Sequence, residues 1–228
     1  MKHKIKTTLS RLFSNNWLIT LTATLIGVFV ALYMNKIVSS KKLENQKTIA
    51  TKNILSEIKQ NQESLEKNIK NQEVLLGTIQ FIKTHMDSEN RVISSVDSMN
   101  IFRKKYPKTF TVQDSVKLEN GKYHYTGEMD MNFGVSYINL TNVAWETLKN
   151  SGLSSSYDFN CLMFLEKMNK VTMDILVKDK EFLELLGNYQ ENENYYDKVI
   201  LKASQLIEYE KGLLNGYKSS PEQLKKCT

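Results

Sequence analysis

The sequence predicts a mainly α-helical protein in which one N-terminal transmembrane helix continues into a long helix. Three observations support this fold class. The 228 residues include only nine glycines and two prolines, too few for the many turns of an all-β fold. A long apolar stretch lies near the N-terminus, and apolar residues then recur at helical spacing to about residue 86. We expect an elongated helical bundle with a small irregular or β-hairpin excursion near 108–140.

The excess of positive over negative charge is confined to the N-terminal part of the chain. The formal net charge is +6, from 31 Lys and Arg against 25 Asp and Glu. Residues 1–42 contain no acidic side chain and seven basic ones, which leaves 24 basic and 25 acidic side chains in residues 43–228. A nucleic-acid-binding domain usually concentrates basic residues on its folded surface. We therefore expect no nucleic acid partner.

Residues 17–38 are expected to form the transmembrane helix, after a basic tail at 1–16. The core of about 18 residues from Trp17 is close to the minimum that crosses about 30 Å of hydrocarbon. Trp17 and Tyr33 are placed to anchor the two interfaces, and Arg11 and Lys36 to extend toward the headgroups. A buried core helix would normally carry a polar face, whereas the only polar side chains of this stretch are threonines. A cleaved signal peptide would end in small residues, whereas bulky residues follow Ala31.

The orientation of this helix is not decided by counting charges. Four Lys or Arg residues precede the span, and five lysines follow it within about 20 residues. The short tail without acidic residues is typical of a signal anchor, which favours a body outside the cytoplasm. The expected location is the bacterial inner membrane, crossed once, with a periplasmic or extracytoplasmic body at 39–228.

The membrane helix carries one face of small residues. Ala23, Gly27 and Ala31 are spaced by four, so that another helix backbone can approach closely. Together with the lipid bilayer, the expected partners are a second copy of the chain or another membrane protein. The span has no ionisable group at its centre, which argues against a proton relay.

A long helix is expected at 39–86, with amides among its apolar heptad positions. One series of positions is Ile58, Leu65, Gln72, Ile79 and Met86, and the other is Ile54, Asn61, Asn68, Leu75 and Ile82. Amides at such positions fix register in parallel coiled coils. The alternative is one long helix of an antiparallel bundle, which we favour because a complete apolar series is missing.

The remaining residues predict further helices around one hairpin. A helix using Val92, Val96, Met99 and Phe102 should end before Tyr106-Pro107. Asn120-Gly121, flanked by alternating apolar residues, predicts a β-hairpin, and Met129, Met131 and Phe133 also alternate. Helices are then expected throughout 141–228.

The ends of those C-terminal helices carry local signals. Thr141-Asn142 is the expected N-cap of the first helix, and Ser151-Gly152 its end. A serine among 154–156 should cap the next helix, which would run to Leu186-Gly187. The last long helix should span about Tyr195 to Leu214, followed by a short turn at Ser220-Pro221-Glu222-Gln223.

No catalytic constellation is recognisable. The sequence lacks a glycine-rich phosphate loop and the HExxH, CxxC and GxSxG motifs. His124 with its neighbours, and His85 with Asp87, are expected to be ordinary polar positions, so that neither a metal nor a cofactor is predicted. Cys161 resembles a core thiol and Cys227 a mobile one, although the two could pair if the body lies outside the cytoplasm. We expect no enzymatic activity.

Two segments resemble a family of uncharacterised bacterial single-pass membrane proteins. They are the apolar stretch from Asn16 to Asn35 with the Lys/Gln-rich helix after it, and Ala144-Trp-Glu-Thr-Leu-Lys-Asn-Ser-Gly152, a WxxLKxSG-type segment. They cover roughly a third of the chain. The resemblance implies a membrane-tethered helical domain and supplies no activity. Trp145 and Leu148 are expected to face the core, and Gly152 to close the helix in a left-handed conformation.

The expected function is that of a membrane-anchored interaction, scaffold or accessory subunit of a membrane complex. The alternative is a ligand-sensing membrane protein that signals through a partner chain. Convergent polar groups in a pocket between helices would favour the sensor, and a bare apolar groove on the surface would favour the scaffold.

Overall fold

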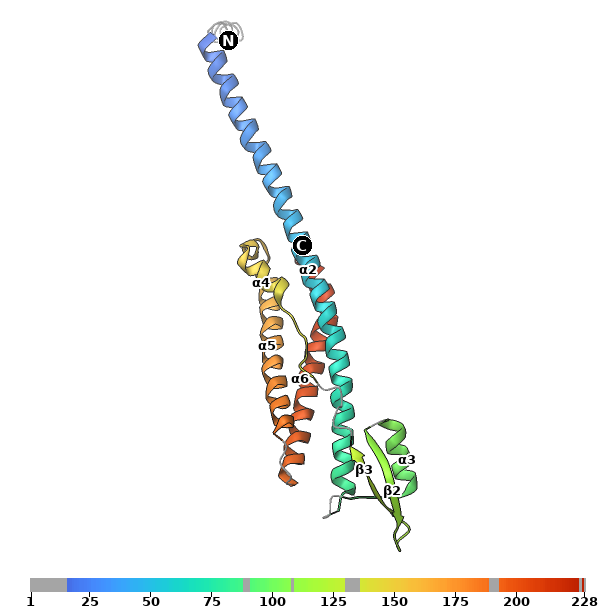
Figure 1. Ribbon diagram of the computed structural model, residues 1–228. Helices are drawn as coiled ribbons and strands as arrows, with labels where there is room; N and C mark the ends of the chain where they lie inside the picture. The colour runs from blue at the N-terminus through green and yellow to red at the C-terminus, as the bar shows by residue number, and fades with distance from the viewer. Residues whose placement is uncertain are drawn as a thin grey trace. The chain divides into compact units, whose positions relative to one another are not determined.

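Figure 1 shows the computed structural model of the chain. It describes residues 16–87, 91–107, 109–129, 136–188, 193–225 and 227. Its elements are α2 (Asn16–His85), β1 (Val92–Ser94), α3 (Val96–Lys105), β2 (Phe110–Lys117), β3 (Tyr123–Met129), α4 (Val143–Asn150), the 3-10 helix η1 (Leu153–Ser156), α5 (Phe159–Gly187) and α6 (Glu193–Lys225). The mainly α-helical fold is confirmed. The chain divides into two units, Met1–Ala50 and Thr51–Thr228.

The first unit is built on the N-terminal part of α2. This part contains a window of 18 residues with a mean hydropathy of 2.0, none of which is buried. It is long and apolar enough to cross a membrane. The hydroxyl groups of Thr20, Thr22 and Thr24 donate to the backbone carbonyl four residues earlier in the same helix. The polar side chains within the apolar stretch therefore find their partners inside the helix.

The second unit contains a helical body made of α2 from Thr51 onward, α4, α5 and α6 (Figure 1). Cross-helix pairs show that α6 runs antiparallel to α2, because Asn61 bonds Tyr217, Asn68 bonds Glu210 and Lys83 bonds Asp197. α5 is also antiparallel to α6, since Thr172 bonds Tyr217 and Lys202 bonds Glu181. The amide positions of the long helix thus lie inside an antiparallel bundle within one chain.

A small sheet lies beside α3 in the same unit. Its order is β1-β3-β2, with both pairs antiparallel. The predicted hairpin is confirmed, with Gly121 at φ +76° in the turn between β2 and β3. Val92, Met99, Phe102, Phe110 and Tyr125 form its buried core. Met131 and Phe133, which continue the predicted alternation, lie outside the described residues.

The helix predicted from Val92 begins later than expected. Val92 pairs with Tyr125 in the sheet, so residues 92–94 are a strand. Ser95 then caps α3, its hydroxyl accepting from the backbone N–H of Ser98 at 3.2 Å. The apolar spacing alone did not separate a short strand from the first turn of a helix.

Two helix boundaries near the C-terminus also differ from expectation. Asp158, and not a serine, caps α5 by accepting from the N–H of Asn160 at 2.8 Å, because 153–156 form η1. α6 continues through Pro221 instead of stopping near Leu214. Proline lacks the backbone N–H that other residues donate inside a helix. Next to Pro221, the hydroxyl of Ser220 donates to the carbonyl of Gly216 at 2.9 Å. Burial of Tyr217 and Leu224 stabilises this extension.

The extension of α6 brings the two cysteines together. Cys161 and Cys227 form a disulfide, with their Cα atoms 5.6 Å apart. Both side chains are buried. The expectation of a core thiol and a separate mobile thiol is therefore wrong. It failed because it placed the end of the last long helix at Leu214, too early to carry Cys227 back to the first turn of α5.

Candidate functional site

The helical body contains a set of buried polar side chains between α2, α5 and α6, which we call the polar seam. Its members are at most 6% exposed: Asn61, Asn68, Gln72, Thr172, Asp179, Glu210 and Tyr217. Buried polar groups are costly unless they find hydrogen-bond partners. The polar seam is therefore the part of the body where position and partner are most tightly specified.

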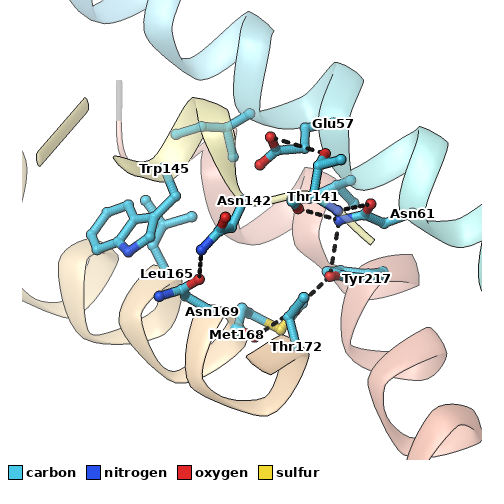
Figure 2. A pocket seen from close by; sticks show the side chains of 12 residues that line it. Glu57, Asn61, Thr141, Asn142, Trp145, Leu165, Met168, Asn169, Thr172 and Tyr217 are labelled. Carbon is cyan, nitrogen blue, oxygen red and sulfur yellow. Dashed lines mark hydrogen bonds between the residues drawn. The ribbon is translucent and has the colours of Figure 1, made fainter. Parts of the chain in front are cut away.

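At one end of the polar seam, Asn61 binds the backbone of the segment that precedes α4 (Figure 2). Its side-chain oxygen accepts from the N–H of Thr141 at 3.0 Å, and its amide nitrogen donates to the carbonyl of Thr141 at 2.8 Å. The same nitrogen donates to the Tyr217 hydroxyl at 3.2 Å, which in turn lies 2.7 Å from the hydroxyl of Thr172. One amide thus joins α2, α6 and the segment before α4.

The start of α4 is capped by a carboxylate from α2. Glu57 accepts from the backbone N–H of Ala144 at 2.9 Å and from the Thr141 hydroxyl at 3.2 Å. Asn142 occupies the N-cap position but its side chain makes no capping bond. It donates instead to the side chain of Asn169 at 2.9 Å. The local cap expected from Asn142 is thus replaced by Glu57 from a distant part of the chain. Its negative charge is favourable there, because the N-terminal end of a helix carries a partial positive charge.

At the other end, two carboxyl groups are buried near one another. One oxygen of Glu210 accepts from Asn68 at 2.8 Å and from Gln72 at 3.1 Å, and one oxygen of Asp179 accepts from the N–H of Ile138 at 2.9 Å. The second oxygen of each carboxyl is buried without a hydrogen-bond partner among the described residues. The oxygen of each acid that lacks a partner has no donor to stabilise a negative charge.

The surroundings raise the pKa of both acids. Burial raises the pKa of Glu210 to about 7, with the charge of Asp179 adding to the effect and the amides of Asn68 and Gln72 opposing it. Burial also raises the pKa of Asp179, against the bonds from Ile138 and Asn68. Uncompensated charge in a low-dielectric interior is unfavourable. The pair therefore has the means to hold a proton near neutral pH.

A small pocket lies beside the Asn61 end of the polar seam (Figure 2). Its lining combines polar and apolar side chains: Ile54, Glu57, Ile58, Asn61, Thr141, Asn142, Trp145, Leu165, Met168, Asn169, Thr172 and Tyr217. The volume of about 30 Å³ is enough for water but far below that of ordinary ligand pockets, which measure about 300–1,000 Å³. The indole N–H of Trp145 is buried without a protein partner among the described residues.

The residues predicted for the membrane helix all lie in the first unit. Ala23, Gly27 and Ala31 are exposed on one side of α2, and a Cβ at Gly27 would meet no atom within 4 Å. Trp17 and Tyr33 are each 66% exposed, and Lys36 is also exposed. Arg11 lies outside the described residues. The packing and anchoring roles of these residues remain predictions.

The WxxLKxSG-type segment is part of the structural core. Trp145 and Leu148 are buried on α4, and Gly152 has φ +74°, in the left-handed region. Trp145 also lines the small pocket, so this segment and the polar seam meet there.

Sequence reasoning found the three amides of the polar seam but not the acids opposite them. Asp179 is flanked at helical spacing by the buried Ile175 and Phe182, and Glu210 by Leu206 and Leu213. A carboxylate at an apolar position of an amphipathic helix was the signal available. It is a weak signal on its own, because it becomes meaningful only when the amides of another helix are known to face it.

No group of three or more His, Cys, Asp or Glu side chains able to hold a metal occurs within the described ranges. Between α2, α4, α5 and α6, the described residues form the polar seam and the water-sized pocket. A larger hollow of about 430 Å³ lies outside these helices, at α3 and the start of β2, and is lined by Asn100, Arg103, Lys104, Pro107, Phe110 and Thr111. Comparison with protein-family models, with curated proteins and with solved structures gives no match for this chain.

Proposed function

We propose that this protein is a single-pass, membrane-anchored interaction or accessory subunit whose helical body lies outside the cytoplasm of a bacterial cell. The observation that carries the proposal is the apolar N-terminal part of α2, where no residue of the 18-residue window is buried. A soluble protein rarely leaves so large a continuous apolar surface uncovered. A lipid bilayer is the environment that would cover it.

The hydrogen bonding of the threonines supports a membrane location. In hydrocarbon a hydroxyl group needs an internal partner, and Thr20 and Thr24 each have one at 2.8 Å in their own helix. Trp17 and Tyr33 lie near the two ends of the apolar stretch, where amphipathic rings favour the headgroup region. These features agree with a spanning helix anchored at both interfaces.

The disulfide supports the orientation. Cys161 and Cys227 are bonded within the second unit, and such bonds persist in oxidising compartments and are rare in the reducing cytoplasm. This argument is independent of the charge distribution around the span, which was nearly balanced. It favours a body on the outer side of the membrane.

The interior of the body favours an interaction role over metabolite sensing. The pocket between α2, α4, α5 and α6 does contain convergent polar groups, which a ligand sensor would need. Its volume of about 30 Å³, however, suits water and not a metabolite. The polar seam binds α2, α5 and α6 to one another, which makes the body a rigid platform for presenting a surface.

A fractionation and topology experiment tests the membrane assignment. The full chain, expressed in a bacterium, is expected to stay with membranes after an alkaline carbonate wash. A phosphatase fused after Thr228 should be active only outside the cytoplasm, and a thiol-reactive maleimide should label Cys161 and Cys227 only after reduction.

Three results would count against the proposal, each against a different part. Release by carbonate contradicts the membrane anchor. An inactive phosphatase, together with fluorescence from a cytoplasmic reporter fused at the same position, contradicts the proposed orientation. Purification in mild detergent as a monomer with no stoichiometric partner argues against an interaction subunit.

A further inference from the structure

Three oxygen atoms of the polar seam are buried without a hydrogen-bond partner among the described residues. They are Oε1 of Gln72, Oδ1 of Asp179 and Oε2 of Glu210, and their side chains are 0%, 1% and 0% exposed. A buried polar atom is costly unless something binds it. Amide and carboxylate oxygens only accept hydrogen bonds. The partner that these three atoms call for is therefore a donor or a cation.

The three side chains meet around the amide of Asn68. Nε2 of Gln72 donates to Oε1 of Glu210 at 3.1 Å, so the amide group that carries the unpartnered Gln72 oxygen faces this acid. Nδ2 of Asn68 donates to the same Glu210 oxygen at 2.8 Å and also lies within hydrogen-bonding reach of Asp179. α2, α5 and α6 thus bring one amide oxygen and two carboxyl groups to one place.

The two acids have no buried positive charge beside them. Among the buried polar residues of the described ranges, Asp179 and Glu210 are the charged ones, and no Lys, Arg or His is buried with them. Lys211, next to Glu210 in sequence, bonds Glu73 at the surface instead. One shared proton would bridge two of the three oxygens and leave one acid charged. A divalent cation would contact all three oxygens and neutralise both charges.

We propose that Gln72, Asp179 and Glu210 form a buried calcium site that ties α2, α5 and α6 together. Carboxylate and amide oxygens are the ligands that hard cations prefer. Calcium accepts carboxylates through one or both oxygens in irregular geometry, whereas magnesium demands a near-ideal octahedron and usually keeps several waters. The inference goes beyond the proposed function and does not depend on it.

Calcium binding to the full chain in detergent tests the site. The purified protein is stripped with a chelator at pH 8, above the pKa of about 7 of Glu210, and calcium alone is added back. We expect about one calcium ion per chain by equilibrium dialysis. The melting temperature should rise by about 5–10 °C when calcium is at about 100 times its dissociation constant. Magnesium at the same concentration should raise it less.

The calcium effect should also depend on pH, because the ligands bind a metal only when deprotonated. At pH 5 a proton occupies Glu210, so added calcium should leave the melting temperature unchanged. In metal-free buffer the pH dependence of stability is that of the acids alone.

Variants locate the ion. Glu210→Gln and Asp179→Asn each remove one ligand charge and keep the size of the side chain, and we expect each to bind calcium at least tenfold more weakly. Gln72→Met removes the amide oxygen without changing the charge and should also weaken binding. Glu208→Gln, at an exposed acid of α6, should bind calcium as the wild type does. The disulfide state and the circular dichroism of each variant report whether the body has folded.

Three results overturn the inference. Stripped wild type that binds no calcium at pH 8 means that the acids hold protons only. A thermal shift in Glu210→Gln equal to that of the wild type places the ion elsewhere. Tighter binding of magnesium than of calcium contradicts the irregular oxygen site. Since these measurements use purified protein, none of them bears on the membrane anchor.

Discussion

Glu210 illustrates how a single residue of the polar seam couples stability to pH. Its carboxyl group is fully buried, one oxygen accepts from two amides, and its pKa is raised to about 7 from an ordinary value of 4.5. Lys211 is next in sequence but bonds Glu73 at 2.9 Å at the surface. Asp179, the other acid that affects Glu210, has a raised pKa as well.

The first prediction is that the body loses stability as pH rises through the range between about 4.5 and 7. In that range the folded state holds a proton on Glu210 that the unfolded state has released, so that stability must fall with increasing pH. The variant Glu210→Gln keeps an acceptor for both amides and cannot ionise. Its melting temperature should therefore depend less on pH, and should exceed that of the wild type at pH 8.

Thermal unfolding followed by circular dichroism at pH 5 and pH 8, in detergent, measures this effect. Glu208→Gln serves as a control, because Glu208 is an exposed acid on the same helix. Equal pH dependence in the wild type and in Glu210→Gln would contradict the assignment of the titrating group.

The second prediction concerns Asn61. Asn61→Ala leaves the N–H and the carbonyl of Thr141 without their side-chain partner, and unsatisfied buried groups cost about 1–3 kcal/mol each. We expect a loss of about 2–4 kcal/mol in the free energy of unfolding by urea. Asn53→Ala, at an exposed position of the same helix, should change it by less than about 0.5 kcal/mol.

At the scale of elements, local sequence signals predicted those features that depend on near neighbours. The β-hairpin followed from Asn120-Gly121, and the end of α5 at Gly187 was anticipated. The signals failed where distant residues decide the outcome. Glu57 on α2 supplies the cap of α4, and the burial of Leu224 keeps α6 helical beyond Pro221.

Only the α2 residues of the polar seam could be predicted from the sequence. Asn61, Asn68 and Gln72 stood out as amides among apolar heptad positions, but their partners lie in distant parts of the chain. Glu210, for example, is more than 130 residues away from Asn68 and from Gln72. Pairing at that distance depends on the register between helices, which a single sequence does not reveal. The disulfide was missed because the last long helix was expected to end at Leu214, whereas α6 runs to Lys225.

The third prediction is that the disulfide stabilises the pairing of α5 with α6. Cys161 and Cys227 are separated by 66 positions, and closing a loop of that size stabilises a fold by about 4 kcal/mol in the chain-entropy description. Cys227→Ser should therefore lower the urea midpoint of the body. Wild type and variant should converge when both are measured with a reductant, and a difference that persists would mean that serine itself disturbs the buried site.

At the scale of the whole molecule, we expect the apolar part of α2 to be where the chain meets another membrane helix. The fourth prediction is that Gly27→Ile weakens association between membrane helices, because a branched side chain keeps two backbones apart at the face formed with Ala23 and Ala31. Cross-linking through position 23 in membranes should fall. Val28→Ile, one position away from that face, provides a control with a similar side chain.

Under the proposed membrane anchoring, the Cys161–Cys227 disulfide would have a mechanical consequence. A pull on the C-terminal residues would pass through the covalent bond into the first turn of α5 and would not have to pass along α6. The hydrogen bonds that α6 makes through Glu210 and Tyr217 would then be shielded from that force. In reducing conditions the same pull would peel α6 from its C-terminal end and break the bond at Tyr217 before those at Glu210.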